Sequence, residues 1–273
     1  MQSLSLRPAK MVVRRLRDGW HSGLVCLGLA DALTPPRHRV RVGNGDFRQT
    51  GEEFLRYFVE LGGLRPTDDV LDVGCGIGRM AVPLTNFLTP PATYCGFDVM
   101  RDSIDWCRET ITPRFPHFRF AWADIRNDTY NPAGAVSPTE FCFPVADASI
   151  DFAFLTSVVT HMMPDHVRHY LAELRRVVRT GGHCLITAFL MNAESRALAA
   201  AGRNQPAFPH MVTEYCSVRR SKKPEDAVAF DETWFLSQLA ANDFALRRPI
   251  VYGSWAGREQ SLSLQDMVVV TRE

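Results

Sequence analysis

The chain has 273 residues, 46% of them hydrophobic, which suffices for one domain with a sizeable core. Its formal net charge of +1 excludes a strong overall field for nucleic acid or another polyanion. The charge is nevertheless uneven, because residues 1–41 contain eight basic and two acidic residues, so the remainder is slightly acidic.

The N-terminal region contains a short apolar stretch at residues 23–33, which includes Asp31. A membrane-spanning helix needs about 20 apolar residues, so we expect a packed helix here and neither a membrane span nor a signal peptide. The basic segment 11–17, followed by Trp20, predicts a solvated or disordered tail. The alternative is an amphipathic helix that makes peripheral contact with an anionic membrane.

From residue 69 onward, short apolar strands alternate with helical patterns, which is typical of a parallel sheet covered on both faces. The predicted strands are residues 70–73, 93–98, 117–122, 151–156, 183–189, 246–252 and 264–271. The predicted helices are residues 50–61, 79–88, 101–112, 164–179 and 232–239. Thr50 with Glu53 forms an expected capping box, Asp231 an expected N-cap, and Gly181 an expected C-terminal cap.

The strongest local motif lies at residues 70–79, with the sequence Val-Leu-Asp-Val-Gly-Cys-Gly-Ile-Gly-Arg. A buried strand runs here into a glycine turn that opens a helix, and glycine lets the backbone approach a ligand closely. The dinucleotide fingerprint G-x-G-x-x-G would need glycine at position 79, where the chain has Arg79. A nicotinamide-dependent oxidoreductase is therefore disfavoured.

Further motifs follow this turn at the ends of the predicted strands. Asp98 lies 20 residues beyond Gly78, where a carboxylate can accept hydrogen bonds from ribose hydroxyls. Asp124 follows the third strand, and the segments 151–156 and 174–182 complete the series. In this order the motifs resemble those of the class I S-adenosylmethionine (SAM)-dependent methyltransferases.

The resemblance implies a fold, a cofactor and a set of cofactor-binding residues. The fold would be a seven-stranded, mostly parallel Rossmann-like sheet with helices on both faces and the last strand antiparallel. The cofactor would be SAM and the product S-adenosylhomocysteine (SAH), with Asp124 at the adenine amino group. The implied cofactor-binding residues are Asp72, Gly74, Cys75, Gly76, Gly78, Arg79, Asp98, Val99, Met100, Asp124, Ile125, Thr156 and Ser157.

The same reading divides the chain into four parts. Residues 1–45 form a basic helical segment, residues 46–191 the SAM-binding core, and residues 230–273 a helix and strands that complete the sheet. Residues 192–229, where the regular rhythm breaks, are expected to form an inserted cap over the substrate. The glycine-containing segment 41–48 predicts either a loop that folds over the cofactor or a plain connecting turn.

His161 is the candidate catalytic residue, because it follows the fourth strand beside the expected methyl donor. An imidazole there can take the proton from an acceptor hydroxyl, although a histidine that packs under the next helix fits the pattern too. His166 and His169 lie three residues apart on one predicted helix. The surrounding sequence has no matching carboxylate or cysteine pattern, so no metal is expected.

The acceptor pocket is predicted from aromatic and apolar residues after the fifth strand, with core packing as the alternative. The candidate substrate-binding residues are Phe189, Met191, Tyr215 and Trp255.

The predicted function is methyl transfer from SAM to a small molecule, with an oxygen acceptor on a sugar, glycolipid or secondary metabolite. Residues 156–159 read Thr-Ser-Val-Val, in place of the Asn-Pro-Pro-Tyr type of motif associated with amino-group methylation. The alternatives are an N-methyltransferase of a small amine and a SAM-binding partner protein without activity. Nucleic acid is not expected as a partner. The seven cysteines are odd in number and form no C-x-x-C pair, which indicates free thiols and a cytoplasmic location.

Overall fold

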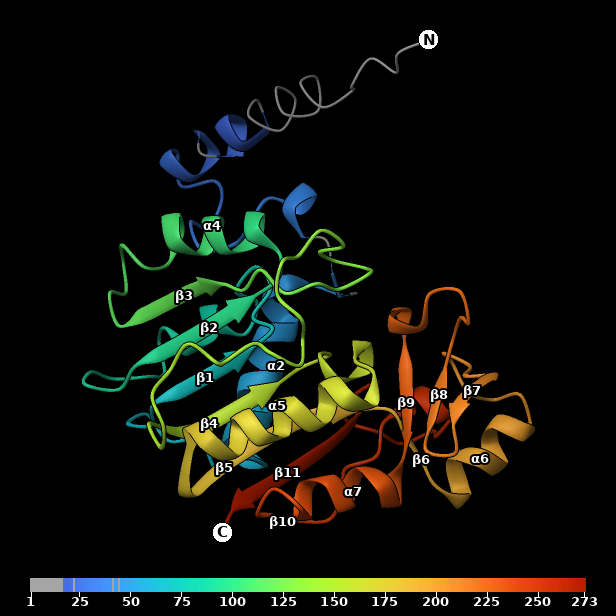
Figure 1. Cartoon of the computed structure of the whole chain (residues 1–273). Coiled ribbons are helices and arrows are strands. Elements are labelled where there is room, and N and C mark those ends of the chain that lie inside the picture. The colour runs from blue at the N-terminus through green and yellow to red at the C-terminus, as the bar shows by residue number, and fades with distance from the viewer. Residues whose placement is uncertain (1–16, 22, 41, 44) are drawn as a thin grey trace.

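The computed structural model describes residues 17–21, 23–40, 42–43 and 45–273. Its centre is a seven-stranded sheet with the order β10-β11-β5-β4-β1-β2-β3 (Figure 1). The strands are β1 (Val70–Val73), β2 (Tyr94–Asp98), β3 (Phe118–Trp122), β4 (Ile150–Leu155), β5 (Val178–Ala188), β10 (Phe244–Leu246) and β11 (Asp266–Arg272). Strand β11 runs antiparallel to β5 and β10, whereas β3, β2, β1, β4 and β5 are mutually parallel. The predicted α/β fold, with its last strand antiparallel, is confirmed.

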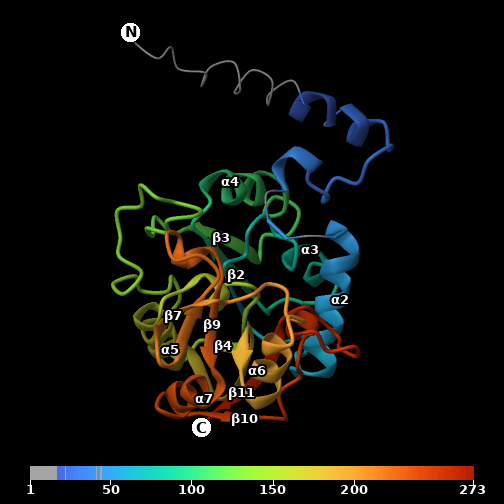
Figure 2. The ribbon, with the colours of Figure 1, turned by 90° about the vertical axis from the view of Figure 1, so that its right-hand side faces the viewer.

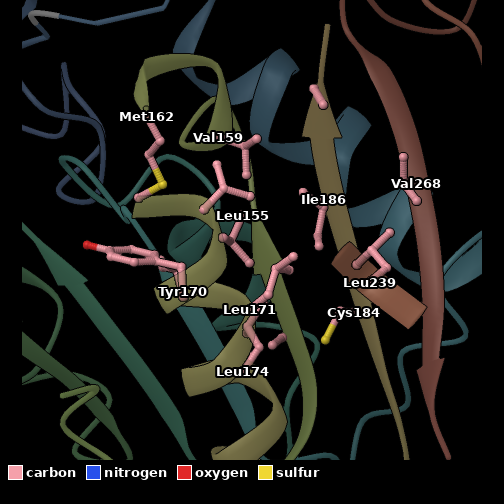
Figure 3. Close-up of a cluster of buried hydrophobic side chains, with 14 of the residues drawn as sticks. Leu155, Val159, Met162, Tyr170, Leu171, Leu174, Cys184, Ile186, Leu239 and Val268 are labelled. Atoms are coloured by element: carbon pink, nitrogen blue, oxygen red, sulfur yellow. The ribbon is translucent and has the colours of Figure 1, made fainter. Parts of the chain in front are cut away.

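Helices cover both faces of this sheet because alternate strand residues point to opposite sides. The face that carries Phe152 and Phe154 packs against α2 (Phe47–Glu60), α3 (Ala81–Leu84) and α4 (Arg101–Thr110). The face that carries Ala153 and Leu155 packs against α5 (Pro164–Val177) and α7 (Glu232–Ala240). Figure 3 shows this second core, in which Leu171 and Leu174 of α5 lie beside Leu155. Each face therefore has its own apolar layer.

A second sheet of four short strands lies beside the main one, in the order β6-β9-β8-β7 (Figures 1 and 2). Its strands are β6 (Leu190–Met191), β7 (His210–Thr213), β8 (Cys216–Val218) and β9 (Val228–Asp231). Helix α6 (Ala193–Ala200) and the 3-10 helix η3 (Pro224–Asp226) belong to the same stretch. The sequence predicted an insertion here and missed its strands, which have only two to four residues each.

Two helix starts differ from the prediction for local reasons. Helix α2 begins at Phe47 because the carboxylate of Asp46 accepts the backbone N–H groups of Arg48 and Gln49, so the expected cap Thr50 lies inside the helix. Helix α3 starts at Ala81 and ends at Leu84, within the predicted range, and Pro83 lies in its first turn, where a backbone N–H has no partner within the helix. Asp231 caps α7 as predicted.

Two predicted ends differ as well. Helix α5 ends at Val177, and Gly181, with a φ of 80°, lies where the register of β5 against β4 shifts, so it belongs to a strand irregularity and is no helix cap. The expected strand at 246–252 is reduced to β10 and an isolated bridge at Val251, because Pro249 cannot donate to a ladder.

The N-terminal stretch lies at one end of the molecule, next to α4 (Figure 1). Residues 17–21 and 23–26 are helical and precede the 3-10 helix η1 (Arg37–Arg39). Leu27 and Leu29 are 73% and 72% exposed, so the apolar stretch is not the packed helix that we expected. The basic segment 11–17 lies, except for Arg17, outside the described residues. Within the described residues, no helix is long and apolar enough to cross a membrane.

Candidate active site at the carboxyl ends of β1, β2 and β4

A cavity of about 780 Å³ opens where β1, β2 and β4 end. This volume lies within the range of roughly 300–1,000 Å³ that is usual for small-molecule sites. Its floor is the glycine turn after β1, where Gly74 and Gly76 have φ values of 78° and 53°. A Cβ on Gly74 would lie 2.4 Å from Cγ2 of Val158, whereas one on Gly76 would meet nothing within 4 Å. Gly76 therefore presents bare backbone to open space, as a close-fitting ligand requires.

Asp98, at the end of β2, lines the cavity next to this turn. Its Oδ2 accepts the backbone N–H of Gly76 at 2.8 Å, and its Oδ1 accepts that of Met100 at 2.7 Å. Burial raises the pKa of Asp98, and these backbone N–H groups oppose the shift. Because a carboxylate has about four lone-pair sites, two remain for a ligand.

Asp72 lies on β1 below the same turn and is fully buried. The Tyr94 hydroxyl donates to its Oδ2 at 2.6 Å, while Oδ1 finds no hydrogen-bond partner among the described residues. Burial raises the pKa of Asp72 to about 8. A cationic ligand near this unpartnered oxygen would favour the ionised carboxylate and lower that pKa.

His161 closes one side of the cavity from the 3-10 helix η2 (Val159–His161). Its Nδ1 lies 2.9 Å from the carbonyl oxygen of Glu225, and its Nε2 lies 3.4 Å from the Tyr130 hydroxyl. A carbonyl oxygen can only accept, so Nδ1 carries the proton and Nε2 of the neutral ring is an acceptor. Burial lowers the pKa of His161, which favours this neutral form.

The opposite wall comes from distant parts of the chain. The segment 261–265 lines the cavity, and Gln265 donates from Nε2 to the hydroxyl of Ser157 at 3.0 Å. Val42 and Gly43 line it from the N-terminal side, where the Arg79 guanidinium donates to the Val42 carbonyl oxygen at 2.9 Å. The site is thus a partly open cavity with mixed polar and apolar walls and a neutral histidine on one of them.

Residues 71–186 match the family model described as a methyltransferase domain. With the glycine turn, the buried acidic residues and the sheet order of the class I enzymes, this match decides the assignment. The chain carries a class I SAM-dependent methyltransferase domain.

Two curated relatives resemble this domain. The phthiotriol/phenolphthiotriol dimycocerosates methyltransferase of Mycobacterium tuberculosis is 34% identical over 125 residues, which are 46% of this chain and 37% of that protein. The malonyl-[acyl-carrier protein] O-methyltransferase of Hahella chejuensis is 30% identical over 122 residues, 45% of this chain and 37% of that protein. The matches thus span little more than a third of each relative.

Solved structures share the fold of the methyltransferase domain. The PH0226 protein of Pyrococcus horikoshii matches with a TM-score of 0.55 and 15% identity, over 86% of this chain and 95% of that one. A SAM-dependent methyltransferase of Methanosarcina mazei matches with a TM-score of 0.51 and 18% identity, over 77% and 94% of the two chains.

Most of the predicted site residues lie around the cavity at the ends of β1, β2 and β4. The predicted cofactor and catalytic residues that line it are Asp72, Gly74, Cys75, Gly76, Arg79, Asp98, Val99, Met100, Ile125, Thr156, Ser157 and His161.

Two predicted cofactor-binding residues lie elsewhere. Gly78 faces α4, where a Cβ would lie 2.9 Å from Cδ1 of Ile111, so its role is to let this helix pack closely. The carboxylate of Asp124 accepts the side-chain amide of Asn131 at 3.1 Å and is absent from the cavity lining. Ile125 lines the cavity beside it instead.

The structure does not bring the predicted substrate-binding residues to this cavity. Phe189, Met191 and Trp255 form a small buried cluster, and the Trp255 Nε1 donates to Asp266 at 2.8 Å. Tyr215 stacks on Trp234 with ring centroids 4.8 Å apart. Phe189, Met191 and Trp255 thus pack the second-sheet segment against residues 254–256, and Tyr215 packs against α7. Such core packing was the alternative weighed for them.

The histidines of α5 do not form a metal site. His169 donates from Nε2 to the carbonyl oxygen of Phe141 at 2.8 Å, while Nδ1 of His166 lies 3.6 Å from Oε1 of Glu225. Within the part of the chain that the structure describes, no three residues of His, Cys, Asp or Glu are grouped as metal ligands.

Sequence reasoning missed several cavity residues. Tyr130 comes from the 126–138 connection, Glu53 and Phe54 come from α2, and the segment 261–265 precedes β11. The only sequence signal for Tyr130 is its position in the connection that follows β3. The segment 261–265 has no recognisable motif. It reaches the cavity because it directly precedes β11, which pairs with β5 in the main sheet.

Proposed function

We propose that the chain is a SAM-dependent methyltransferase that methylates an oxygen of a small or lipid-like molecule. SAM would lie over Gly74 and Gly76, with Asp98 accepting hydrogen bonds from the ribose hydroxyls. The buried carboxyl of Asp72 would face the positively charged part of the ligand. The observation that carries the oxygen-acceptor assignment is the neutral His161, whose Nε2 is an acceptor at the cavity wall.

SAM, when bound, supplies a methyl group already activated on a sulfonium. The protein then has to align an acceptor with that group and remove a proton. Nε2 of His161 accepts the proton of the acceptor hydroxyl. The hydrogen bond from Nδ1 to Glu225 holds the ring in place and stabilises the imidazolium that results. Apolar residues of the wall, including Met162 and Leu262, limit the access of water to the acceptor.

Two observations support the proposed class of methyl acceptor: the residues of the cavity wall and the names of two curated relatives. The wall combines the hydroxyl groups of Ser254, Ser261 and Ser263 with apolar groups such as Phe54 and Leu264. One relative is named for a lipid acceptor and another for a carrier-bound malonyl group. A hydroxylated molecule with an apolar part, such as a glycolipid or a secondary metabolite, fits such a wall. The seven free cysteines support a cytoplasmic location as part of the proposal.

The test is SAH release by the purified chain with pools of hydroxylated and amine acceptors, using wild type and His161→Asn. An asparagine retains a donor near the position of Nδ1, so it can still meet the Glu225 carbonyl, but it has no atom in place of Nε2. We expect turnover to fall by about 10²- to 10⁴-fold. The matched control is His169→Asn, because His169 bonds to Phe141 outside the cavity.

The outcomes separate the alternatives. Near-normal turnover of His161→Asn, with unchanged affinity for SAH by calorimetry, would exclude His161 as the base. Turnover with amines alone would favour an N-methyltransferase. SAH binding without turnover in any acceptor pool would identify a SAM-binding partner protein.

A further inference from the structure

One residue of the second-sheet segment, Glu225, lies directly behind His161, outside the cavity lining. It lies in η3, which packs against η2, the short helix that carries His161. Its carbonyl oxygen accepts from Nδ1 of His161 at 2.9 Å. Its side chain is only 9% exposed and reaches the backbone N–H of Asp128. Both the carbonyl oxygen and the side chain of Glu225 are therefore held in the region behind His161.

The Glu225 carboxylate is held by one further element. Oε2 accepts the backbone N–H of Asp128 at 2.8 Å, in the connection that also carries Tyr130. Oε1 lies 3.6 Å from Nδ1 of His166, which itself accepts the backbone N–H of Met163, so no hydrogen bond joins these two atoms. The carboxylate therefore fixes the backbone of η3 against the 126–138 connection, and so fixes the carbonyl that His161 meets.

That carbonyl determines which nitrogen of His161 can act as a base. Because the oxygen accepts only, it selects the form with the proton on Nδ1, which leaves the lone pair on Nε2. The Tyr130 hydroxyl lies 3.4 Å from this nitrogen and donates to its lone pair, so an acceptor hydroxyl would take the place of Tyr130 there. The Tyr130 ring is perpendicular to the imidazole, at an interplanar angle of 87° and a centroid distance of 5.3 Å. A histidine without a fixed partner at Nδ1 would exchange between two tautomers, one of which has no lone pair on Nε2.

We propose that Glu225 is the positioning residue of His161: its carboxylate, anchored on Asp128, holds the carbonyl that keeps the Nε2 lone pair of His161 available. This inference rests on the proposed role of His161 as the base. In the reaction, the acceptor oxygen forms its bond to the methyl carbon as the S–C bond breaks, and the hydroxyl proton moves to Nε2. The resulting imidazolium keeps its Nδ1–H bond to Glu225.

The test is the tautomer of His161, which needs no acceptor. Imidazole ¹⁵N chemical shifts of the full chain with SAH distinguish the two nitrogens, and His161→Asn assigns the signal. In wild type we expect the single form with the proton on Nδ1. Glu225→Ala and the shorter Glu225→Asp should lose that single form, whereas Glu225→Gln should keep it, because its amide oxygen still accepts from Asp128.

The control is Glu173→Ala, which removes another buried carboxylate that accepts a backbone N–H, that of Phe143, away from His161. If Glu225→Ala does not fold, Glu225→Asp decides the question. The proposal is overturned if folded Glu225→Ala or Glu225→Asp keeps the wild-type tautomer. It is overturned too if Glu173→Ala or Glu225→Gln changes the tautomer as much as Glu225→Ala. Failure of wild type to bind SAH would instead refute the proposed function, whatever the tautomer.

Discussion

Replacement of Asp72 by asparagine tests the electrostatics of the site floor. The carboxyl is fully buried, and burial raises its pKa from 3.8 to about 8. Between these two values the folded chain keeps a proton on Asp72 that the unfolded chain has released. The stability that this proton contributes is fully present below pH 3.8 and is lost as the pH rises through the folded pKa.

The size of the stability change follows from the interval between the two pKa values of Asp72, 3.8 and about 8. Well inside it, each pH unit costs about 1.4 kcal/mol of unfolding free energy, so a rise from pH 5 to pH 7 costs about 2.7 kcal/mol. The asparagine side chain in Asp72→Asn would have the same shape, would still accept from the Tyr94 hydroxyl and would not titrate. The stability of wild type relative to Asp72→Asn should therefore fall by that amount over this range.

The measurement is urea unfolding of both proteins without SAH at pH 5, 6 and 7, followed by tryptophan fluorescence. Asp165→Asn is the control, because the Asp165 side chain is 78% exposed. If wild type and Asp72→Asn lose stability in parallel as the pH rises, the carboxyl is already ionised in the folded chain and the electrostatic account of the site is wrong.

Three further predictions concern the turn, the second acidic residue and the N-terminal stretch. Gly74→Ala should weaken SAH binding in calorimetry because its Cβ would collide with Val158, whereas Gly181→Ala, also at positive φ but in open space, should leave it unchanged; equal affinities would contradict this. Asp98→Asn turns an N–H toward a backbone donor, so SAH should bind about 10- to 100-fold more weakly, and unchanged binding would remove Asp98 from the site. Trp20, 74% exposed, should contribute to pelleting with anionic vesicles, so Trp20→Ala should pellet less than the control Met211→Ala, 76% exposed; equal pelleting would exclude this contact.

The core of the fold could be predicted because its local patterns agree with its tertiary contacts. Strand β1 was predicted with its observed ends, since a buried apolar run leads there directly into glycines that only a sharp turn accommodates. The same holds for Asp98, which the end of β2 places beside that turn. Where the chemistry of a residue and the topology of a parallel sheet point to the same edge, the sequence suffices.

The acceptor side of the site could not be predicted in this way. The wrong assignment of Trp255 shows why: an aromatic residue between glycines fits a pocket wall and a buried cluster equally well, and the hydrogen bond to Asp266 decides for the cluster. Glu225 was missed because it acts through a carbonyl oxygen, which every residue has. For Asp124 the sequence did not show that Asn131, seven residues later, donates to its Oδ1, and its role at the adenine amino group stays a prediction.

The wall of the cavity has a practical consequence for altering what the protein accepts. Gln265 joins the wall from just before β11, although the segment that matches the family model ends at residue 186. A shortened protein that keeps only residues 71–186 would retain the recognisable motifs and lose one side of its binding chamber. Libraries aimed at new acceptors should therefore vary residues 126–138 and 261–265 and leave the glycine turn untouched.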